Sequence, residues 1–370
     1  MAFEPRIERL AENNGTLTVS LSNLNYSIVN SLRRTILTDI PVVCFKTFPY
    51  NESNCEIIKN TSQLNNEIIK HRLSCIPIHL DPDEEYYKNI KVIINKKNDT
   101  DEIIYVTTED IILIDSVSDK QIPQEDVKKY FPANEITKDY IDIVRLKPRL
   151  SKDIPGEELY LESTLTVSTA KESSAFNAVS LCSYINTPDV INANETWIEI
   201  EKKLKSEKLS KEEIEYQKED WFNLDAKRIF IENSFEFNVE SVGIFNNLDI
   251  IKKACNILKQ KLVDLEEKFK ADNIIINKLI ATGDNIHEII LEEIDHTIGK
   301  IIEYALYEIY YESRKTISLC GFYKKHPHDN FSIIKVAFND EVDNGIIRDY
   351  FVTSINECIN IFEKFIDKLK

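Results

Sequence analysis

Apolar and polar residues alternate over residues 15–22, which is the spacing typical of a half-buried β-strand. A helical pattern follows directly, because Ile28, Leu32 and Ile36 lie four residues apart and would share one helix face. Pro41 then ends the helix, since its ring cannot continue the helical hydrogen bonding. The N-terminal segment therefore predicts a strand followed by an amphipathic helix.

The middle of the chain has a different pattern. Short apolar runs separated by Asn, Asp and Pro predict mostly β structure from residue 87 to residue 180. A short helix is expected over residues 64–73, ahead of Pro77. Residues 202–220 are almost entirely polar, and we expect a solvated helix or a linker there.

The most regular helical pattern lies after residue 245. Seven apolar residues alternate in steps of three and four, which is the heptad spacing of a helix that packs against another helix. They are Leu248, Ile251, Cys255, Leu258, Leu262, Leu265 and Phe269. The last hundred residues predict strands at 274–280, 287–291 and 331–338, a helix at 294–311 and a final helix at 346–369.

Part of this pattern occurs twice, at an offset of 270 residues. The segment Leu24-Asn25-Tyr26-Ser27-Ile28, with Leu32 and Ile36, corresponds to Ile294-Asp295-His296-Thr297-Ile298, with Ile302 and Leu306. Asn25 and Asp295 stand in the same place, and both are residue types that cap helix N-termini. Each copy is followed, after further strands, by a long helix with an apolar face. We therefore predict two strand–helix–strand–helix modules, the first interrupted by the β-rich segment.

The composition fits a globular protein, with 42% hydrophobic and 9% aromatic residues in a chain of 370. The 46 Lys and Arg against 63 Asp and Glu give a formal charge of −17, which disfavours direct, nonspecific binding of nucleic acid. The seven glycines are too widely spaced for a Walker loop or a Rossmann fingerprint, so both kinds of nucleotide site are excluded.

The seven cysteines are scattered along the chain, which excludes paired CxxC metal and redox motifs. We expect them to be reduced residues of the core. The N-terminus has no apolar signal segment, and the longest charge-free stretch is rich in Asn, Ser and Thr, so no membrane span is expected. These features predict a soluble, intracellular protein.

Three motifs occur in order before residue 245. The first is Asn30-Ser31-Leu32-Arg33-Arg34 with Ile40-Pro41, the second is His71-Arg72-Leu73 with Ile76-Pro77, and the third is Phe235–Gly243. Together they resemble the bacterial RNA polymerase alpha subunit and its eukaryotic and archaeal counterparts, the third-largest-subunit (archaeal D) family.

Two later motifs resemble a second family. Residues Asp295–Lys300 and Tyr323–Pro327 are similar to the small partner of that subunit, the eleventh-subunit or archaeal L family. The resemblance implies that two subunit families are fused in one polypeptide, an arrangement reminiscent of large nucleocytoplasmic DNA viruses. For a viral protein, the expected locations are the virion and the viral factory in the host cytoplasm.

The resemblance implies an α+β fold, in which two alpha-like dimerisation modules pair through a four-helix interface. The first module, residues 1–50 and 181–270, would carry a mostly β insert domain at 51–180, and residues 271–370 would form the second module. Burying each interface side chain contributes roughly 1.5–3 kcal/mol before ordering costs, which favours this pairing. The predicted interface residues are Ile28, Leu32, Ile36, Leu258, Leu262, Leu265, Ile298, Ile302, Phe351, Ile355 and Phe362.

The resemblance also implies a scaffold on which the largest and second-largest subunits of a DNA-directed RNA polymerase assemble. Arg33, Arg34, His71 and Arg72 are the candidate residues for docking these large subunits. Small zinc-bearing accessory subunits are further expected partners, whereas no specific DNA contact is expected. Many relatives carry a cysteine-rich metal segment, but residues 81–180 contain no cysteine, so we expect no metal and no cofactor.

Two alternatives stay open. A free homodimeric binding or regulatory module could use the same helix faces. His326, His328 and Asp329 could ligate a metal in a hydrolase, but no further ligand lies nearby in sequence, and the resemblance places them at a turn between strands. Nucleophile elbows, metalloprotease motifs and an aspartate triad for magnesium are absent from the sequence. We therefore predict no catalytic site in this chain.

Overall fold

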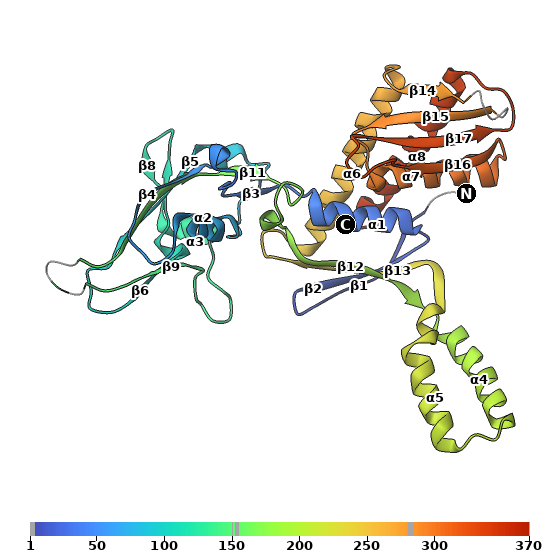
Figure 1. Ribbon diagram of the computed structural model, residues 1–370, viewed down its shortest axis with the longest axis horizontal. Helices are drawn as coiled ribbons and strands as arrows, with labels where there is room; N and C mark the ends of the chain where they lie inside the picture. The colour runs from blue at the N-terminus through green and yellow to red at the C-terminus, as the bar shows by residue number, and fades with distance from the viewer. Residues whose placement is uncertain (1–3, 150, 152–154, 280–284, 370) are drawn as a thin grey trace. The chain divides into compact units, whose positions relative to one another are not determined.

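The computed structural model describes residues 4–149, 151, 155–279 and 285–369 (Figure 1). The chain divides into two compact units. The first contains Met1–Thr35, Leu181–Glu240 and Ile251–Lys370, and the second contains Ile36–Ser180 and Ser241–Ile250. The predicted insert, residues 51–180, lies within the second unit. Both proposed modules contribute to the first unit, so their separation into two domains stays a prediction.

In the residues that the structure describes, the first unit contains two four-stranded sheets. The first sheet consists of β1 (Arg6–Asn13), β2 (Thr16–Ser22), β12 (Val179–Pro188) and β13 (Phe230–Ser241), in the order β1-β2-β13-β12. Along β2, Leu17, Val19 and Leu21 are buried and alternate with partly exposed residues, which confirms the predicted strand.

The second sheet consists of β14 (Ile275–Lys278), β15 (Asn285–Glu292), β16 (Ile317–Tyr323) and β17 (Phe331–Phe338), in the order β14-β15-β17-β16. Taken in chain order, the strands of both sheets are arranged first, second, fourth, third. The buried residues of β15, which are His287, Ile289 and Leu291, lie 270 positions after those of β2. Residue 280, the end of a predicted strand, lies outside the described residues.

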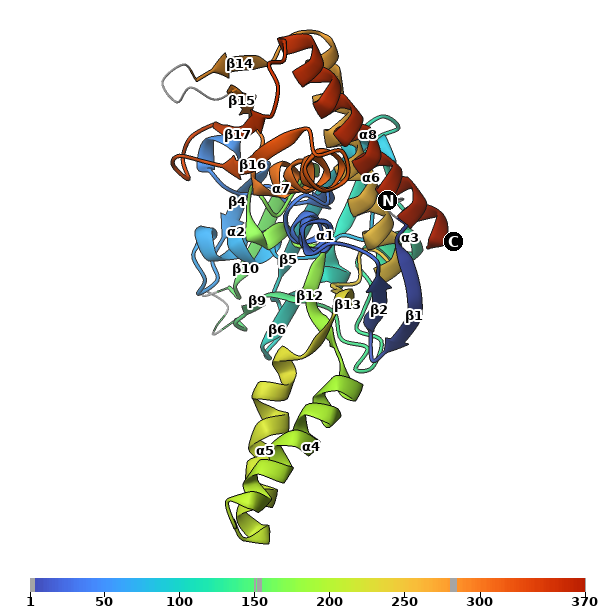
Figure 2. The same cartoon turned by 90° about the vertical axis from the view of Figure 1, so that its right-hand side faces the viewer.

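Four helices accompany these sheets (Figure 2): α1 (Tyr26–Thr38), α6 (Asn247–Lys270), α7 (His296–Leu306) and α8 (Asn344–Lys368). The two shorter helices begin in the same way. Asn25 Oδ1 accepts a hydrogen bond from the Ser27 N–H at 2.8 Å, and Asp295 Oδ1 accepts one from the Thr297 N–H at 2.9 Å. This shared N-terminal cap agrees with the repeat in the sequence.

The helix predicted at residues 294–311 changes form before its end. α7 ends at Leu306, and a π-helical segment, η7 (Tyr307–Ser313), continues it. Tyr310 in this segment is buried and stacks on Tyr350 of α8, with the ring centroids 3.8 Å apart. The wider π turn is therefore held against α8 by a buried aromatic contact.

A pair of helices connects β12 to β13. α4 (Val190–Ser206) and α5 (Lys211–Asn223) lie side by side and are followed by the 3-10 turn η5 (Asp225–Arg228) (Figures 1 and 2). Trp197 packs against Phe222 across the pair, with ring centroids 6.2 Å apart. Ser210 and Glu213 form a capping box that begins α5. The polar segment expected at 202–220 is thus mainly helical and belongs to this hairpin.

The second unit is mostly β, as predicted for the insert. Among the described residues of this unit, the largest sheet has the order β4-β10-β5-β7-β8, and two further strand pairs are β3 with β11 and β6 with β9. The strands are β3 (Val42–Cys44), β4 (Cys55–Asn60), β5 (Ile90–Lys97), β6 (Ile104–Thr107), β7 (Ile112–Asp115), β8 (Lys120–Gln121), β9 (Asp142–Leu146), β10 (Glu158–Thr164) and β11 (Thr166–Ser168).

Helical elements of the second unit cover part of this β structure. α2 (Asn66–Ser74) corresponds to the predicted short helix, and 3-10 turns occur at η1 (Tyr50–Glu52), η2 (Glu85–Asn89), η3 (Thr108–Asp110) and η4 (Ser174–Phe176). The helix α3 (Gln124–Tyr130) lies where only strands were predicted. Pro123 precedes it, and Glu125 and Asp126 in its first turn favour a helix start.

Candidate assembly interface

Helix α1 contacts helix α7 within the first unit. Arg34 Nε donates a hydrogen bond to Thr297 Oγ1 at 2.9 Å, and Arg34 Nη2 lies 3.4 Å from Asp295 Oδ2. Burial raises the pKa of the Asp295 carboxyl, but hydrogen bonds from Thr297 and the charge of Arg34 outweigh this effect, so the pKa lies below its usual value. The arginine motif of the first repeat therefore contacts the helix cap of the second.

The two long helices, α6 and α8, also contact each other. Phe269 stacks on Phe351 with ring centroids 4.9 Å apart. Asn356 Nδ2 of α8 donates a hydrogen bond to Glu266 Oε1 of α6 at 2.7 Å. The two long helices are therefore joined by an aromatic contact and a hydrogen bond.

All eleven predicted interface residues are buried, with at most 4% of their surface exposed. They are Ile28, Leu32, Ile36, Leu258, Leu262, Leu265, Ile298, Ile302, Phe351, Ile355 and Phe362. Ten belong to the first unit, whereas Ile36 belongs to the second. Their burial is the property that an interface requires, and their role in pairing two modules stays a prediction.

The two arginines predicted to dock a large subunit have different surroundings. Arg34 makes the contacts to α7 described above, so part of its hydrogen-bonding capacity is used inside the molecule. Arg33 Nε donates a hydrogen bond to Asn30 Oδ1 at 3.1 Å on its own helix. Burial raises the pKa of the nearby Cys182 thiol to about 12, although the charge of Arg33 acts in the opposite direction. Docking through Arg33 stays a prediction.

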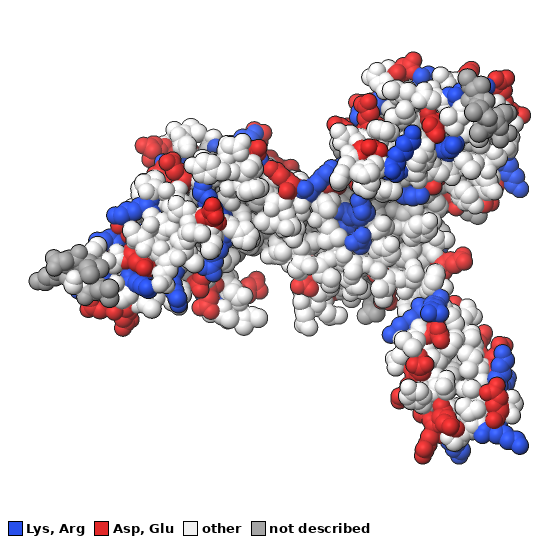
Figure 3. Space-filling view, viewed as in Figure 1, with Lys and Arg blue, Asp and Glu red and all other residues white. Residues whose placement is uncertain are grey.

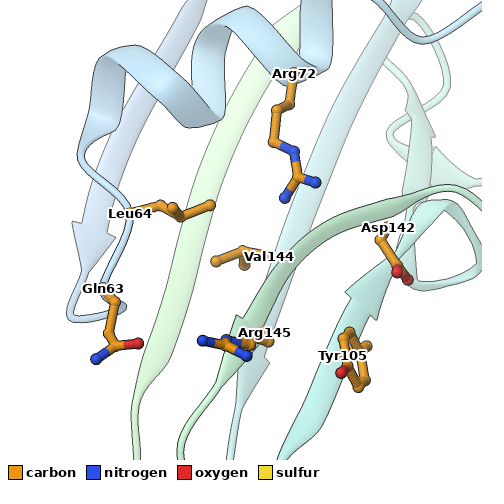
Figure 4. Close-up of a pocket in the computed structure, with 7 residues that line it drawn as sticks. All are labelled: Gln63, Leu64, Arg72, Tyr105, Asp142, Val144 and Arg145. Carbon is orange, nitrogen blue, oxygen red and sulfur yellow. The ribbon is translucent and has the colours of Figure 1, made fainter.

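The other predicted pair, His71 and Arg72, lies at the end of α2 in the second unit, and both side chains are exposed. Arg72 Nη1 donates a hydrogen bond to the backbone oxygen of Ile143 at 2.8 Å, which fixes the guanidinium beside β9. Arg72 also lines a cavity of about 340 Å³ (Figure 4). The other lining residues are Gln63, Leu64, Tyr105, Asp142, Val144 and Arg145.

This cavity is suited to an acidic group. Tyr105 and Arg145 are opposite each other on β6 and β9, and both are exposed. Within the described residues, Arg145 makes no ion pair, so its charge is available together with that of Arg72. The two guanidinium groups outnumber the one carboxylate of the lining, that of Asp142, so a further carboxylate is favoured as a ligand through charge-assisted hydrogen bonds. The sequence motif identified Arg72, but Arg145 lies on a separate strand and was missed.

A second cavity, here named the tyrosine cavity, lies between the start of α1 and the end of α7 in the first unit. Its volume is about 280 Å³. It is lined by residues 25–27 and by Lys300, Glu303, Tyr304, Tyr307, Glu308 and Cys320. Sequence analysis did not identify it as a site. The signal in the sequence that could have found it is the offset of 270 residues, which pairs Arg34 with Tyr304 near the end of α7.

The histidines and Asp329 suspected as metal ligands are not arranged as a metal site. In the described part of the chain, no group of three His, Cys, Asp or Glu residues is placed to hold a metal ion. At the suspected cluster, the His326 N–H donates to Asp329 Oδ2 at 3.0 Å and the His328 N–H donates to His326 Nδ1 at 3.2 Å. These side chains therefore shape a turn between β16 and β17.

The surface has mixed charge. On the face shown in Figure 3, Lys and Arg side chains are interspersed with Asp and Glu. Such a surface offers no broad basic area on that face for nucleic acid. Among the helices that the structure describes, none has the length and apolar character needed to span a bilayer.

Comparison of the sequence with known proteins finds similarity to RNA polymerase subunits. Residues 18–262 match the family described as RNA polymerase Rpb3/Rpb11 dimerisation domain. The chain is 25% identical over 312 residues to the DNA-directed RNA polymerases I and III subunit rpac1 of Dictyostelium discoideum, covering 74% of this chain and 83% of that protein. It is 22% identical over 295 residues to the DNA-directed RNA polymerase subunit Rpo3 of Methanobrevibacter smithii, covering 69% and 94%.

A third relative is the DNA-directed RNA polymerase II subunit rpb3 of Dictyostelium discoideum, which is 23% identical over 318 residues. That similarity covers 71% of this chain and 94% of the relative. The family match ends within α6, so the second repeat lies beyond it.

Proposed function

Because the chain belongs to the RNA polymerase Rpb3/Rpb11 dimerisation domain family, we propose that it is a non-catalytic assembly subunit of a DNA-directed RNA polymerase. Its task is to hold the catalytic subunits in place while they synthesise RNA on a DNA template. The chain itself supplies binding surfaces and no reacting groups.

The finer proposal is that both partners of the alpha-type heterodimer are present in this one chain. The observation that carries it is the contact of Arg34 with Thr297, which joins the first helices of the two repeats. The matching strand orders of the two sheets and the matching helix caps support the same interpretation. Fusion makes the pairing intramolecular and fixes the ratio of the two modules at one to one.

The proposed partners are the largest and second-largest polymerase subunits. Arg33 is the candidate contact on α1, and the cavity at Arg72 and Arg145 is suited to an acidic group of a second partner. Small zinc-bearing accessory subunits are further candidates. The fusion is also the basis for proposing an origin in a large DNA virus.

The test is to capture the tagged full-length chain from its source cells or virions and to identify the bound proteins by mass spectrometry. We expect both large polymerase subunits in near-equal amounts. Their absence from a well-folded preparation would overturn the proposal. Sedimentation of the isolated chain separates the alternative, because intramolecular pairing predicts a monomer of 43.0 kDa and a homodimeric module predicts twice that mass.

A further inference from the structure

The contact between α1 and α7 has two ends that the sequence repeat relates to each other. In a contact between two similar modules, a pair of residues at one end has a counterpart at the other end with the roles exchanged. Arg34 contacts Thr297 at one end. At an offset of 270 residues, the counterparts are Tyr304 and Ser27, and both line the tyrosine cavity. The cavity is therefore the counterpart of the place that the Arg34 guanidinium occupies.

The two ends have opposite charge. The adjacent residues Arg33 and Arg34 correspond to Glu303 and Tyr304. Two cysteines beside them reflect this difference, since the charge of Arg33 lowers the pKa of the Cys182 thiol while the charge of Glu303 raises that of the Cys320 thiol. For each thiol, burial is the larger effect and raises the pKa to about 12. The end at Arg33 and Arg34 is thus basic and filled by a side chain, whereas the end at Glu303 and Tyr304 is acidic and contains a cavity.

The lining of the tyrosine cavity is suited to a cation. Tyr26 and Tyr307 are 63% and 38% exposed, so their rings are accessible from solvent. Glu303 is already engaged, with Lys300 at 2.5 Å and the Phe322 N–H at 3.1 Å. A carboxylate beside aromatic rings binds a guanidinium or ammonium group through charge and cation–π attraction together.

The Glu308 side chain supplies the free charge. Within the described residues, its carboxylate makes no hydrogen bond or ion pair, and it faces the cavity that Tyr304 and Tyr307 also line. Its charge adds to burial in raising the pKa of Tyr304 to about 12. Glu308 also belongs to η7, and π-helical segments of this kind occur frequently at functional sites.

We infer that the tyrosine cavity receives an Arg or Lys side chain of one large polymerase subunit, which thereby docks on the second repeat. The inference rests on the proposed function. The incoming cation occupies the position in the second repeat that corresponds to the Arg34 guanidinium in the first. The two ends of the contact between α1 and α7 therefore select two different partners. Charge of opposite sign at the two ends gives each partner a single productive position.

The test uses the full-length tagged chain assembled with its polymerase subunits, and quantitative mass spectrometry of both large subunits. Glu308→Lys should lower the recovery of one large subunit at least about tenfold relative to the other. Glu308→Gln should have a smaller effect in the same direction. Glu292→Lys, an exposed residue of β15 with the same change in charge, is the matched control and should recover both subunits as the wild type does.

Equal recovery of both large subunits by Glu308→Lys would overturn the inference while leaving the proposed function intact. Recovery of neither subunit by the wild-type chain would overturn the proposed function, and this inference with it. If Glu308→Lys melts at a lower temperature than the wild type, Tyr26→Ala replaces it in the test, because this exposed side chain is not part of the core. Tyr26→Ala should then lower the recovery of the same large subunit. A photo-crosslinker at position 26 should attach to a segment containing Arg or Lys, and attachment to an acidic segment would contradict the inference.

Discussion

The two repeats of the first unit have the same strand order and the same helix caps, yet they differ at matched positions. At the offset of 270 residues, Val29 of α1 corresponds to Gly299 of α7, and Leu17 of β2 corresponds to His287 of β15. Val29 and Leu17 are ordinary buried apolar side chains. The topology is therefore compatible with two different ways of filling the space between helix and sheet.

Gly299 shows how the second repeat fills the space between its helix and its sheet. A Cβ atom placed there would lie 2.0 Å from Cε2 of Phe322, so α7 approaches the ring on β16 more closely than any other residue type permits. The first repeat instead places a valine on the corresponding helix position. The two repeats thus bury the same faces of their strands and helices, whereas the distance between helix and sheet differs from one repeat to the other.

The largest effect is expected where the two repeats meet. Phe351→Ala should lower the free energy of unfolding by about 3–5 kcal/mol, because it removes a fully buried ring that stacks on Phe269. Urea denaturation of the full chain measures this change. If the repeats share one core, the double variant with Phe269→Ala should lose less than the sum of the two single losses.

Tyr216→Ala is the control for this prediction, since its ring is 70% exposed and its loss should change the free energy of unfolding by less than about 0.5 kcal/mol. Additive losses at Phe269 and Phe351 would mean that the two repeats are energetically independent.

The next prediction tests the difference between Val29 of α1 and Gly299 of α7. Gly299→Val installs the residue of the first repeat and should lower the free energy of unfolding by about 1–3 kcal/mol, because the new side chain overlaps the Phe322 ring. Thermal or urea unfolding measures the loss. Gly321→Val, on β16, is the matched control, since no atom lies within 4 Å of a Cβ at that position. Equal stability of the two variants would show that the close approach of α7 is not needed.

Sequence patterns predicted the parts of this structure that depend on local periodicity. The alternation over residues 15–22 gave a strand, and the heptad spacing of α6 identified buried residues such as Leu258 and Leu262. The sequence could not show which side chains meet across long separations. Arg34 was identified from its motif as a docking residue, but its partner Thr297 lies 263 positions away. The tyrosine cavity was missed for the same reason, because it joins Tyr26 to Glu308.

A smaller effect is expected at the Arg34 contact. Arg34→Met should lower the free energy of unfolding by about 1 kcal/mol, since the side chain is 43% exposed and solvent screens its charge. A double-mutant cycle with Thr297→Val measures the coupling between the two side chains. Arg33→Met is the matched control and should leave stability nearly unchanged, because its hydrogen bond stays within α1. No coupling between positions 34 and 297 would contradict the contact.

The smallest effect concerns the response to pH of the second repeat. His287 is buried, its Nδ1 has no hydrogen-bond partner among the described residues, and its ring packs edge-on against Phe338. Burial is the largest effect and lowers the pKa of this imidazole, and the charge of Lys278 lowers the pKa further. The unfolded chain therefore binds a proton more readily than the folded protein does.

It follows that the contribution of His287 to the free energy of unfolding should be constant well above pH 6.5 and decrease as the pH falls below about 6.5, the usual pKa of histidine. His287→Leu installs the residue that the first repeat has at Leu17, and it should remove this part of the decrease between pH 7.5 and pH 5.5. Urea unfolding at the two pH values measures it, with His328→Leu as an exposed control. An unchanged pH response in His287→Leu would mean that the buried imidazole is not the group that distinguishes the two repeats. A reduced response would show that a leucine fulfils the same packing role without titrating, as it does in β2.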